Sequence, residues 1–495
     1  MDKGSAVEQD DFARLFRGFL ERMQLPEPVD RESLTDRLRA HLGADPLELP
    51  VVGASYPPYD QANVHLALTA WFGGEPELVG VSGMHRGHHT LTELLQLAGQ
   101  HGAFGVGPVD YANVAISPDD ELACVDFGFF LGAGTDGPVA VLMRGPRPDY
   151  GTASVMVEVL AASRDAAARV LGDLPALIAE HNVFRGQVVS FEGGQFGPGV
   201  GPFRFHRRPE LTRADIVLAD GVLERVERHV VGIARHRTAL LAAGQHLRRG
   251  VLLYGPPGTG KTHTVRYLLS VMPDFTVVLL AGTTIGLIQQ ACALARMLQP
   301  ALVVLEDCDL VAEARDFRHG NVNPLLFQVL NEMDGLADEA DVAFLLTTNR
   351  ADLLEPALSQ RPGRVDLAVE IPLPDAEGRR LLIALYGPDL RLDERELSDV
   401  VERTEGTTAS FAKELVRRAV LIAAERGSAE TAGDDVRAAA DELLSDRDAL
   451  TRRLLGDHPD ETTALPAGAM AMPTVYPGYG PSFTMGGFIA QPPDE

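Results

Sequence analysis

Residues 255–262, with the sequence GPPGTGKT, have the residue types and spacing of a phosphate-binding loop. They follow the apolar stretch VLLY at 251–254 and precede THTVRYLL, so the pattern G-x-x-x-x-G-K-[ST] stands between an expected strand and an expected helix. Glycines allow backbone N–H groups to turn toward an anion, and the helix adds the positive end of its dipole. An ordinary glycine-rich turn is the alternative, and a match of this length in this context disfavours it.

Two side chains of this loop would complete the site. Lys261 places a point charge near the β- and γ-phosphates, and the Thr262 hydroxyl can ligate Mg²⁺. Among 44 basic residues only Lys3, Lys261 and Lys413 are lysines, so Lys261 stands out against an arginine background. The other loop residues expected to hold phosphates are Gly255, Pro256, Pro257, Gly258, Thr259 and Gly260.

A second cluster of reactive residues ends the apolar stretch ALVVLE at 301–306. Glu306 and Asp307 are adjacent there, where parallel α/β sheets place their ligands. One carboxylate could hold Mg²⁺ and the other could polarise an attacking water. A solvated strand end is the alternative.

The order of GPPGTGKT, the acidic strand end, LLTTNR and RPGRVD resembles that of AAA-type ATPases of the AAA+ superfamily, over about residues 213–418. The resemblance implies ATP as the nucleotide. It implies that Glu306 serves Mg²⁺ together with Thr262, and that Asp307 activates water. The common family order is Asp then Glu, so the swap shortens the second side chain, which bears on the rate of hydrolysis and not on ATP binding.

The same resemblance assigns three more residues. Asn349 falls at the sensor-1 position, where its amide would orient the water or contact the γ-phosphate. Arg361 and Arg364 match two arginine fingers that act on the neighbouring subunit's site. The resemblance therefore implies a homo-oligomeric ring, a hexamer in most of the family. An arginine-rich turn is the alternative for 361–364.

Other segments match the family less well. Thr284, Ile285 and Gly286 stand where many members have an aromatic pore loop, and Ile285 could wedge against a substrate. Residues 313–321 are a candidate second, basic pore loop, and a solvated surface loop is the alternative. Residues 406–419 stand where many members have a G-x-[ST]-G-A-D-type turn, whose second Gly and Asp are replaced here by Ala409 and Phe411. No sensor-2 arginine is assigned, and Arg417 and Arg418 are candidates only.

The spacing of apolar residues predicts the elements that position these groups. Strands are expected at 121–131, 139–144, 154–160 and 186–191, with a helix capped by Ser163, and then at 251–254, 275–280, 301–306, 342–348 and 367–371. The second series alternates with helices, which predicts a P-loop NTPase parallel sheet (α/β) with a helical lid, preceded by a separate α+β N-terminal domain.

This organisation divides the chain into four expected parts. They are an N-terminal partner-selecting domain at 1–205, an ATPase core at 206–374, a helical lid at 375–457 and a disordered Pro/Gly/Met-rich tail at 458–495.

Composition limits the function further. The 495 residues carry a net charge of −26, which disfavours nucleic-acid binding because that needs clustered basic charge. No stretch has about 18 uninterrupted apolar residues, so no membrane span is expected. Three cysteines and an acidic N-terminus favour the cytoplasm. His85, His88 and His89 invite a metal site, but a polar loop is the better interpretation.

Two functions are compatible with these features. The first is a chaperone-like ATPase that hydrolyses ATP to remodel an unidentified protein substrate. The second is a scaffold that assembles on ATP, hydrolyses it slowly and presents its N-terminal domains. A nucleic-acid remodeller is a third and weaker possibility.

Overall fold

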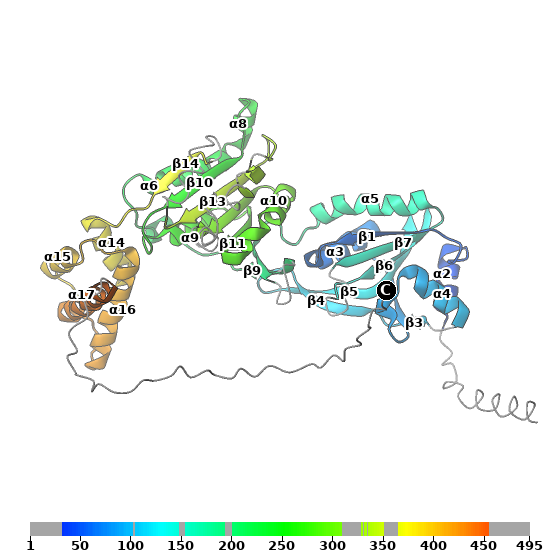
Figure 1. Ribbon diagram of the computed structural model, residues 1–495, viewed down its shortest axis with the longest axis horizontal. Coiled ribbons are helices and arrows are strands. Elements are labelled where there is room, and N and C mark those ends of the chain that lie inside the picture. Colours follow the sequence, from blue (N-terminus) through cyan, green and yellow to red (C-terminus); the bar gives the residue numbers. More distant parts are fainter. Residues whose placement is uncertain are drawn as a thin grey trace, which may run out of the picture. The chain divides into compact units, whose positions relative to one another are not determined.

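The computed structural model of the chain is shown in Figure 1. The structure describes residues 32–101, 104–147, 154–193, 200–308, 328–329, 331–333, 335–350 and 365–454. The tail expected at 458–495 lies outside the described residues.

The N-terminal region contains an antiparallel sheet in the order β1-β7-β6-β5-β2-β3, with β4 paired to β5. The β5–β6 hairpin turns at Gly137, whose φ of 110° is open to glycine without strain. The three strands expected at 121–131, 139–144 and 154–160 are confirmed as β5, β6 and β7. The strands are β1 (Val51–Tyr56), β2 (Glu77–Ser82), β3 (Gly105–Gly107), β4 (Asp110–Ala115), β5 (Glu121–Gly134), β6 (Gly137–Arg144) and β7 (Val155–Ala161).

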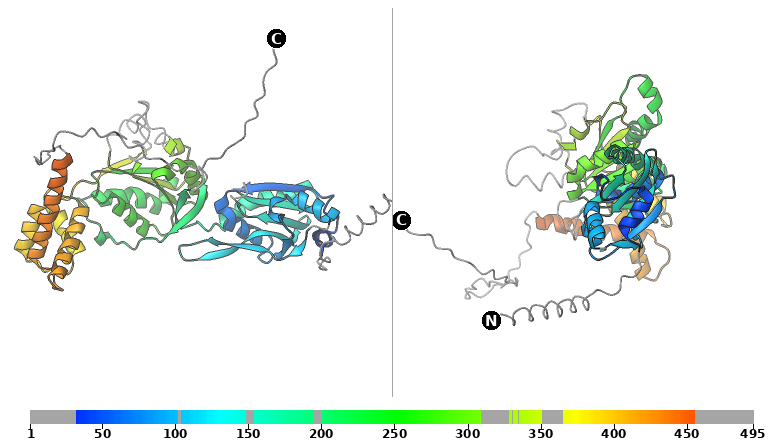
Figure 2. Two further views of the ribbon diagram at one scale, coloured as in Figure 1. Left: turned by 60° about the horizontal axis from the view of Figure 1, so that its bottom comes forward. Right: turned by 90° about the vertical axis from the view of Figure 1, so that its right-hand side faces the viewer.

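Helices cover both faces of this sheet (Figure 1 and Figure 2). Helices α3 (Gln61–Trp71) and α5 (Arg164–Glu180) share one hydrophobic core with it, and α2 (Leu34–Leu42) and α4 (Leu91–His101) share the other. The Ser163 hydroxyl accepts the Ala166 N–H at 3.2 Å, which confirms the predicted cap of α5. The region is the expected α+β arrangement.

The second sheet is parallel apart from one edge strand, in the order β14-β10-β13-β12-β11-β8-β9. All five predicted strands of this region are present. They are β10 (Arg249–Tyr254), β11 (Thr276–Ala281), β12 (Ala301–Glu306), β13 (Val342–Thr348) and β14 (Leu367–Glu370).

Continuous apolar runs form these strands because both faces of the sheet are buried. In β12, Val303 and Leu305 enter the core shared with α10 (Ile288–Met297). Leu302 and Val304 enter the opposite core, shared with α9 (Lys261–Val271) and α6 (Val222–Glu227). The arrangement confirms the predicted α/β fold class.

Two strands at one edge of the second sheet come from residues that the sequence patterns placed in the N-terminal domain. The strand expected at 186–191 is present as β8 (Val188–Gly193), and it pairs in parallel with β11. Strand β9 (Val200–His206) pairs antiparallel with β8. The second sheet therefore draws on residues before 206, while the division of the chain into domains stays a prediction.

After β14 every described element is helical, as predicted for the lid. The helices are α14 (Ala376–Tyr386), α15 (Glu394–Arg403), α16 (Ala409–Glu425) and α17 (Gly433–Leu454). Caps start three of them, since Asp375, Asp393 and Thr408 each accept an N–H of the first turn.

Candidate active site

The loop between β10 and α9 has the backbone of an anion cradle. Gly255, Gly258 and Gly260 have φ values of 144°, 77° and 110°. A Cβ at Gly255 would lie 2.3 Å from the Ile371 carbonyl oxygen, so only glycine fits there. Lys261 is 6% exposed, and its Nζ donates to the carbonyl oxygens of Gly255 and Pro256, each at 2.8 Å. Its ammonium is thus held beside the loop.

A cavity of about 440 Å³ opens at this loop. It combines the loop with the carboxyl ends of β12 and β13 and with the first turns of α16. The residues that line it are Pro257, Gly258, Gly260, Lys261, Thr262, His263, Arg266, Asp307, Asn349, Tyr386, Ala409, Ser410 and Lys413. Of the predicted site residues that the structure describes, Gly255, Pro256, Thr259 and Glu306 are not among them.

The acidic pair lies where β12 ends. Strands β12 and β13 are parallel neighbours, so Glu306, Asp307 and Asn349 come to the same edge of the sheet. Burial raises the pKa of the Glu306 carboxyl, the charge of Asp307 raises it further, and Arg266 opposes both. Asp307 has a φ of 51°, and its N–H donates to the Thr347 hydroxyl at 3.0 Å.

The cavity is suited to an anion. Among the described residues that line it, Lys261, Arg266 and Lys413 are cationic and only Asp307 carries a carboxylate. Lys413 was not among the residues that the sequence predicted for this site. A signal was present, since Lys413 shares with Lys261 the rarity of lysine in this chain.

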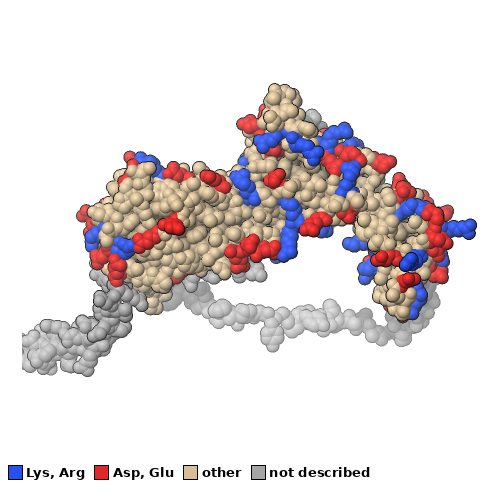
Figure 3. Space-filling model, turned by 180° about the vertical axis from the view of Figure 1, so that it is seen from behind, with Lys and Arg blue, Asp and Glu red and all other residues tan. Residues whose placement is uncertain are grey.

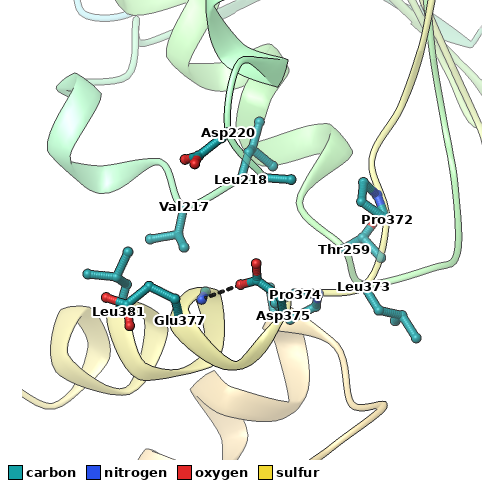
Figure 4. A pocket seen from close by; sticks show the side chains of 13 residues that line it. Val217, Leu218, Asp220, Thr259, Pro372, Leu373, Pro374, Asp375, Glu377 and Leu381 are labelled. Atoms are coloured by element: carbon teal, nitrogen blue, oxygen red, sulfur yellow. Dashed lines mark hydrogen bonds between the residues drawn. The ribbon is translucent and has the colours of Figure 1, made fainter.

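A smaller cavity of about 180 Å³ adjoins the loop (Figure 4). Val217 and Leu218 lie on one side of it, and Leu381 and Glu377 of α14 lie on the other. Ala409 lines both cavities, which makes them neighbours. One wall of the smaller cavity is fixed by the Asp375 cap, which accepts the Gly378 N–H at 2.7 Å.

The lid contacts the phosphate loop through the start of α16. The Ser410 N–H donates to the Gly258 carbonyl oxygen at 3.0 Å. Arg417 and Arg418, the candidates for a sensor-2 arginine, pair instead with Glu414 on their own helix. Neither lines the cavity.

Some predicted functional residues lie elsewhere. Ile285 is 2% exposed and packs in the core that α10 shares with the sheet. Its side chain is therefore not exposed to contact a substrate, as the sequence suggested it could be. Arg361, Arg364 and the segment 313–321 lie outside the described residues.

Within the described ranges, no group of three or more His, Cys, Asp or Glu side chains is placed to bind a metal ion. No helix in the part of the chain that the structure describes is both long and apolar enough to cross a membrane.

The fold and the site define a P-loop nucleotide-binding protein with a helical lid. Residues 251–373 match the family model described as ATPase family associated with various cellular activities (AAA). Over 269 residues the chain is 30% identical to a proteasome-activating nucleotidase of Pyrococcus abyssi, which covers 52% of this chain and 68% of that protein. The chain therefore belongs to the AAA family of ATPases.

A second group of relatives is longer. The ATP-dependent zinc metalloprotease FtsH of Mycobacterium tuberculosis is 28% identical over 337 residues, or 63% of this chain and 44% of that protein. FtsH 2 of Symbiobacterium thermophilum is 30% identical over 308 residues, or 58% of this chain and 52% of that protein. The chain spans only about half the length of these metalloproteases.

Proposed function

We propose that this AAA ATPase hydrolyses ATP with Mg²⁺ and couples hydrolysis to remodelling of a protein partner, as a homo-oligomeric ring and most simply a hexamer. One observation carries the proposal. A single cavity of about 440 Å³ brings together Lys261, Asp307 and Asn349 at the carboxyl ends of three parallel strands. This is the set of groups that phosphoryl transfer to water requires.

The two neighbouring cavities have complementary chemistry for a nucleotide. The larger one is cationic and borders the loop amides, which suits a triphosphate. The smaller one has the apolar side chains of Val217, Leu218 and Leu381, which suit the faces of an adenine ring. In this proposal the nucleotide passes from one to the other beside Ala409.

The donor set near the larger cavity fits Mg²⁺. The hydroxyl of Thr262 and the carboxylate of Glu306 are oxygen ligands, and Mg²⁺ is commonly held by one or two carboxylates plus phosphates. When bound, the ion would neutralise charge on the β- and γ-phosphates.

The remaining roles belong to protein side chains. Asp307 accepts the proton of the attacking water, and Asn349 orients that water. Lys261 exchanges its two carbonyl acceptors for phosphate oxygens. Arg361 and Arg364 act from the neighbouring subunit on the charge that develops in the transition state.

The partner is proposed to be a protein, handled in the cytoplasm and selected by residues 1–205. The support comes from the relatives, whose names link them to the proteasome or to proteolysis. The surface charge is compatible with this. On the face that Figure 3 shows, the acidic and basic side chains of the described residues are interspersed, which disfavours a nucleic-acid partner.

A trapping experiment tests the proposal. Asp307→Asn should bind ATP, assemble and stall, whereas Lys261→Ala should fail to hold ATP. A protein that is enriched with Asp307→Asn in ATP, and lost when Lys261→Ala is added to that variant, is the client of a remodeller. Recovery of the same amount of that protein with Asp307→Asn and with the double variant Asp307→Asn/Lys261→Ala would contradict ATP-driven remodelling.

One observation favours a second candidate, an ATP-assembled scaffold with slow hydrolysis. The only aliphatic residue at the expected pore-loop position, Ile285, is buried, which removes one means of gripping a polypeptide. The steady-state rate separates the two candidates. A partner should stimulate hydrolysis by a remodeller and leave that of a scaffold unchanged.

A further inference from the structure

We propose that Thr347 is a positioning residue that sets the Asp307 carboxylate to activate the water that attacks ATP, and so compensates for the short side chain at that position. The inference rests on the proposed function, in which Asp307 activates water. It concerns a residue on β13 that touches neither nucleotide nor water in this account and acts only through the backbone of Asp307.

The backbone of Asp307 has an unusual conformation. Among the residues that the structure describes, only His85 and Asp307 are non-glycine residues with positive φ, and the value for Asp307 is 51°. This left-handed conformation is disfavoured for residues with a Cβ, although Asp tolerates it better than most. A residue in this conformation at a functional site needs a surrounding structure that holds it there.

Thr347 supplies that hold. Its hydroxyl accepts the Asp307 N–H at 3.0 Å, and the residue is 1% exposed. Thr347 belongs to β13, which is hydrogen-bonded to β12 in parallel up to Leu346 and Leu305. The side-chain bond therefore takes over where the regular pairing of the two strands ends.

The turn has a direct effect on where the carboxylate lies. The left-handed φ takes the chain out of the extended conformation of β12 directly after Glu306, so it sets the direction in which the Asp307 side chain leaves the backbone. Asp307 lines the cavity of about 440 Å³ at the phosphate loop, whereas Glu306 does not. An aspartate has one methylene fewer than a glutamate, so its carboxylate follows the backbone more closely.

The substitution Thr347→Val isolates this bond. Valine has nearly the same shape but lacks the hydroxyl, which leaves the Asp307 N–H without its acceptor. We expect kcat to fall about tenfold or more, because a small misplacement of a catalytic group has that effect on rate. The dissociation constant for ATP should stay within about twofold, since the phosphate loop is untouched.

Two further variants separate positioning from simple damage to the sheet. Thr347→Ser keeps the hydroxyl and should restore most of the rate. Thr276→Val is a matched control, because Thr276 is a fully buried threonine of β11 in the same sheet whose hydroxyl donates to the Leu298 carbonyl oxygen. It should leave kcat unchanged at temperatures where the protein is folded.

A double substitution tests whether Thr347 acts through Asp307. In an Asp307→Asn background, Thr347→Val should lower the residual rate by less than about twofold, because the group it positions has already gone. Equal losses in both backgrounds would overturn the inference. So would a wild-type kcat in Thr347→Val, or a parallel loss of ATP affinity.

The outcome distinguishes this inference from the proposed function. A wild-type chain that hydrolyses ATP, with Thr347→Val equally active, rejects the role of Thr347 alone. A wild-type chain that binds ATP without hydrolysing it rejects the proposed function, and the inference falls with it.

Discussion

At the scale of single residues, the cationic side chains of α16 differ in whether they are paired with a carboxylate. Arg417 and Arg418 share Glu414, which holds the pKa of that carboxyl at about 2. No carboxylate among the described residues lies within ion-pair distance of Lys413, whose Nζ is 5.9 Å from the centre of the Tyr386 ring. Lys413 therefore has its charge available to a ligand of the cavity that it lines.

We expect Lys413 to contribute to the discrimination between ATP and ADP. Ser410 and Lys413 lie one turn apart on the face of α16 that borders the cavity. A charge-assisted hydrogen bond contributes about 1.5–3 kcal/mol, which corresponds to roughly tenfold or more in affinity. Lys413→Gln should weaken binding of ATP by about that factor and of ADP by much less, as measured by direct nucleotide titration.

The controls for this prediction lie on the same helix. Lys413→Arg keeps the charge and should retain the preference for ATP. Arg417→Gln removes an arginine that is paired with Glu414, and it should change neither affinity. Equal weakening of ATP and ADP by Lys413→Gln would contradict a role in sensing the terminal phosphate.

At the scale of elements, the sequence predicts best where a strand or helix is defined by its own residues. The five apolar runs from 251 to 371 all became strands of one sheet, because burial on both faces requires continuous apolar residues. Pairing between distant segments was less predictable. The short strands β1 and β4 have mixed composition, and nothing local to β8 indicates that it joins β11 across the sequence.

The same division holds for the site. The cradle, Lys261 and the acidic pair were predictable because each is a contiguous motif next to its strand. Lys413 and Thr347 were not selected, because their roles depend on which elements meet in space. The burial of Ile285 could not be predicted either, because it depends on a short helical turn at Gly282–Leu287 that directs this side chain into the core.

A buried carboxyl near the start of α3 makes stability depend on pH. Asp60 is 7% exposed, and burial raises its pKa to about 6, against the hydrogen bond from Asn63 Nδ2 at 2.8 Å. A raised pKa in the folded state means that the protonated carboxyl favours folding. This contribution is complete below the usual pKa of 3.8 and is lost as pH rises through about 6.

Asp60→Asn should remove this dependence, because the amide stays neutral at every pH. With about 1.4 kcal/mol for each unit of pKa, the variant should gain up to about 3 kcal/mol over the wild type near pH 8. The gain should shrink as pH is lowered toward about 5.5. Thermal unfolding of both proteins at several pH values checks the trend, and a gain that is independent of pH would contradict it.

At the scale of the whole molecule, the chain is strongly acidic, with a net charge of −26, while its phosphate cavity is locally cationic. This contrast favours an anion at that cavity over extended contact with nucleic acid. The proposed ring adds a further requirement. The fingers Arg361 and Arg364 must reach the site of a neighbouring subunit.

Mixed rings test this requirement. Arg361→Ala subunits keep an intact phosphate loop, and Lys261→Ala subunits keep intact fingers. In a mixed ring, some sites combine an intact phosphate loop from one subunit with intact arginine fingers from its neighbour. Hydrolysis should therefore recover to a measurable fraction of the wild-type rate. Absence of recovery in rings verified to contain both subunits would contradict sites shared between neighbours.

The central claim is that the Lys261–Asp307–Asn349 cavity hydrolyses ATP. The most direct test is the Mg²⁺-dependent turnover of the wild type and of Asp307→Asn, with ATP binding measured on the same preparations. We expect similar ATP binding by the two proteins and a loss of turnover in Asp307→Asn of about a hundredfold or more. Binding without hydrolysis by the wild type, or equal turnover by the two proteins, would contradict it.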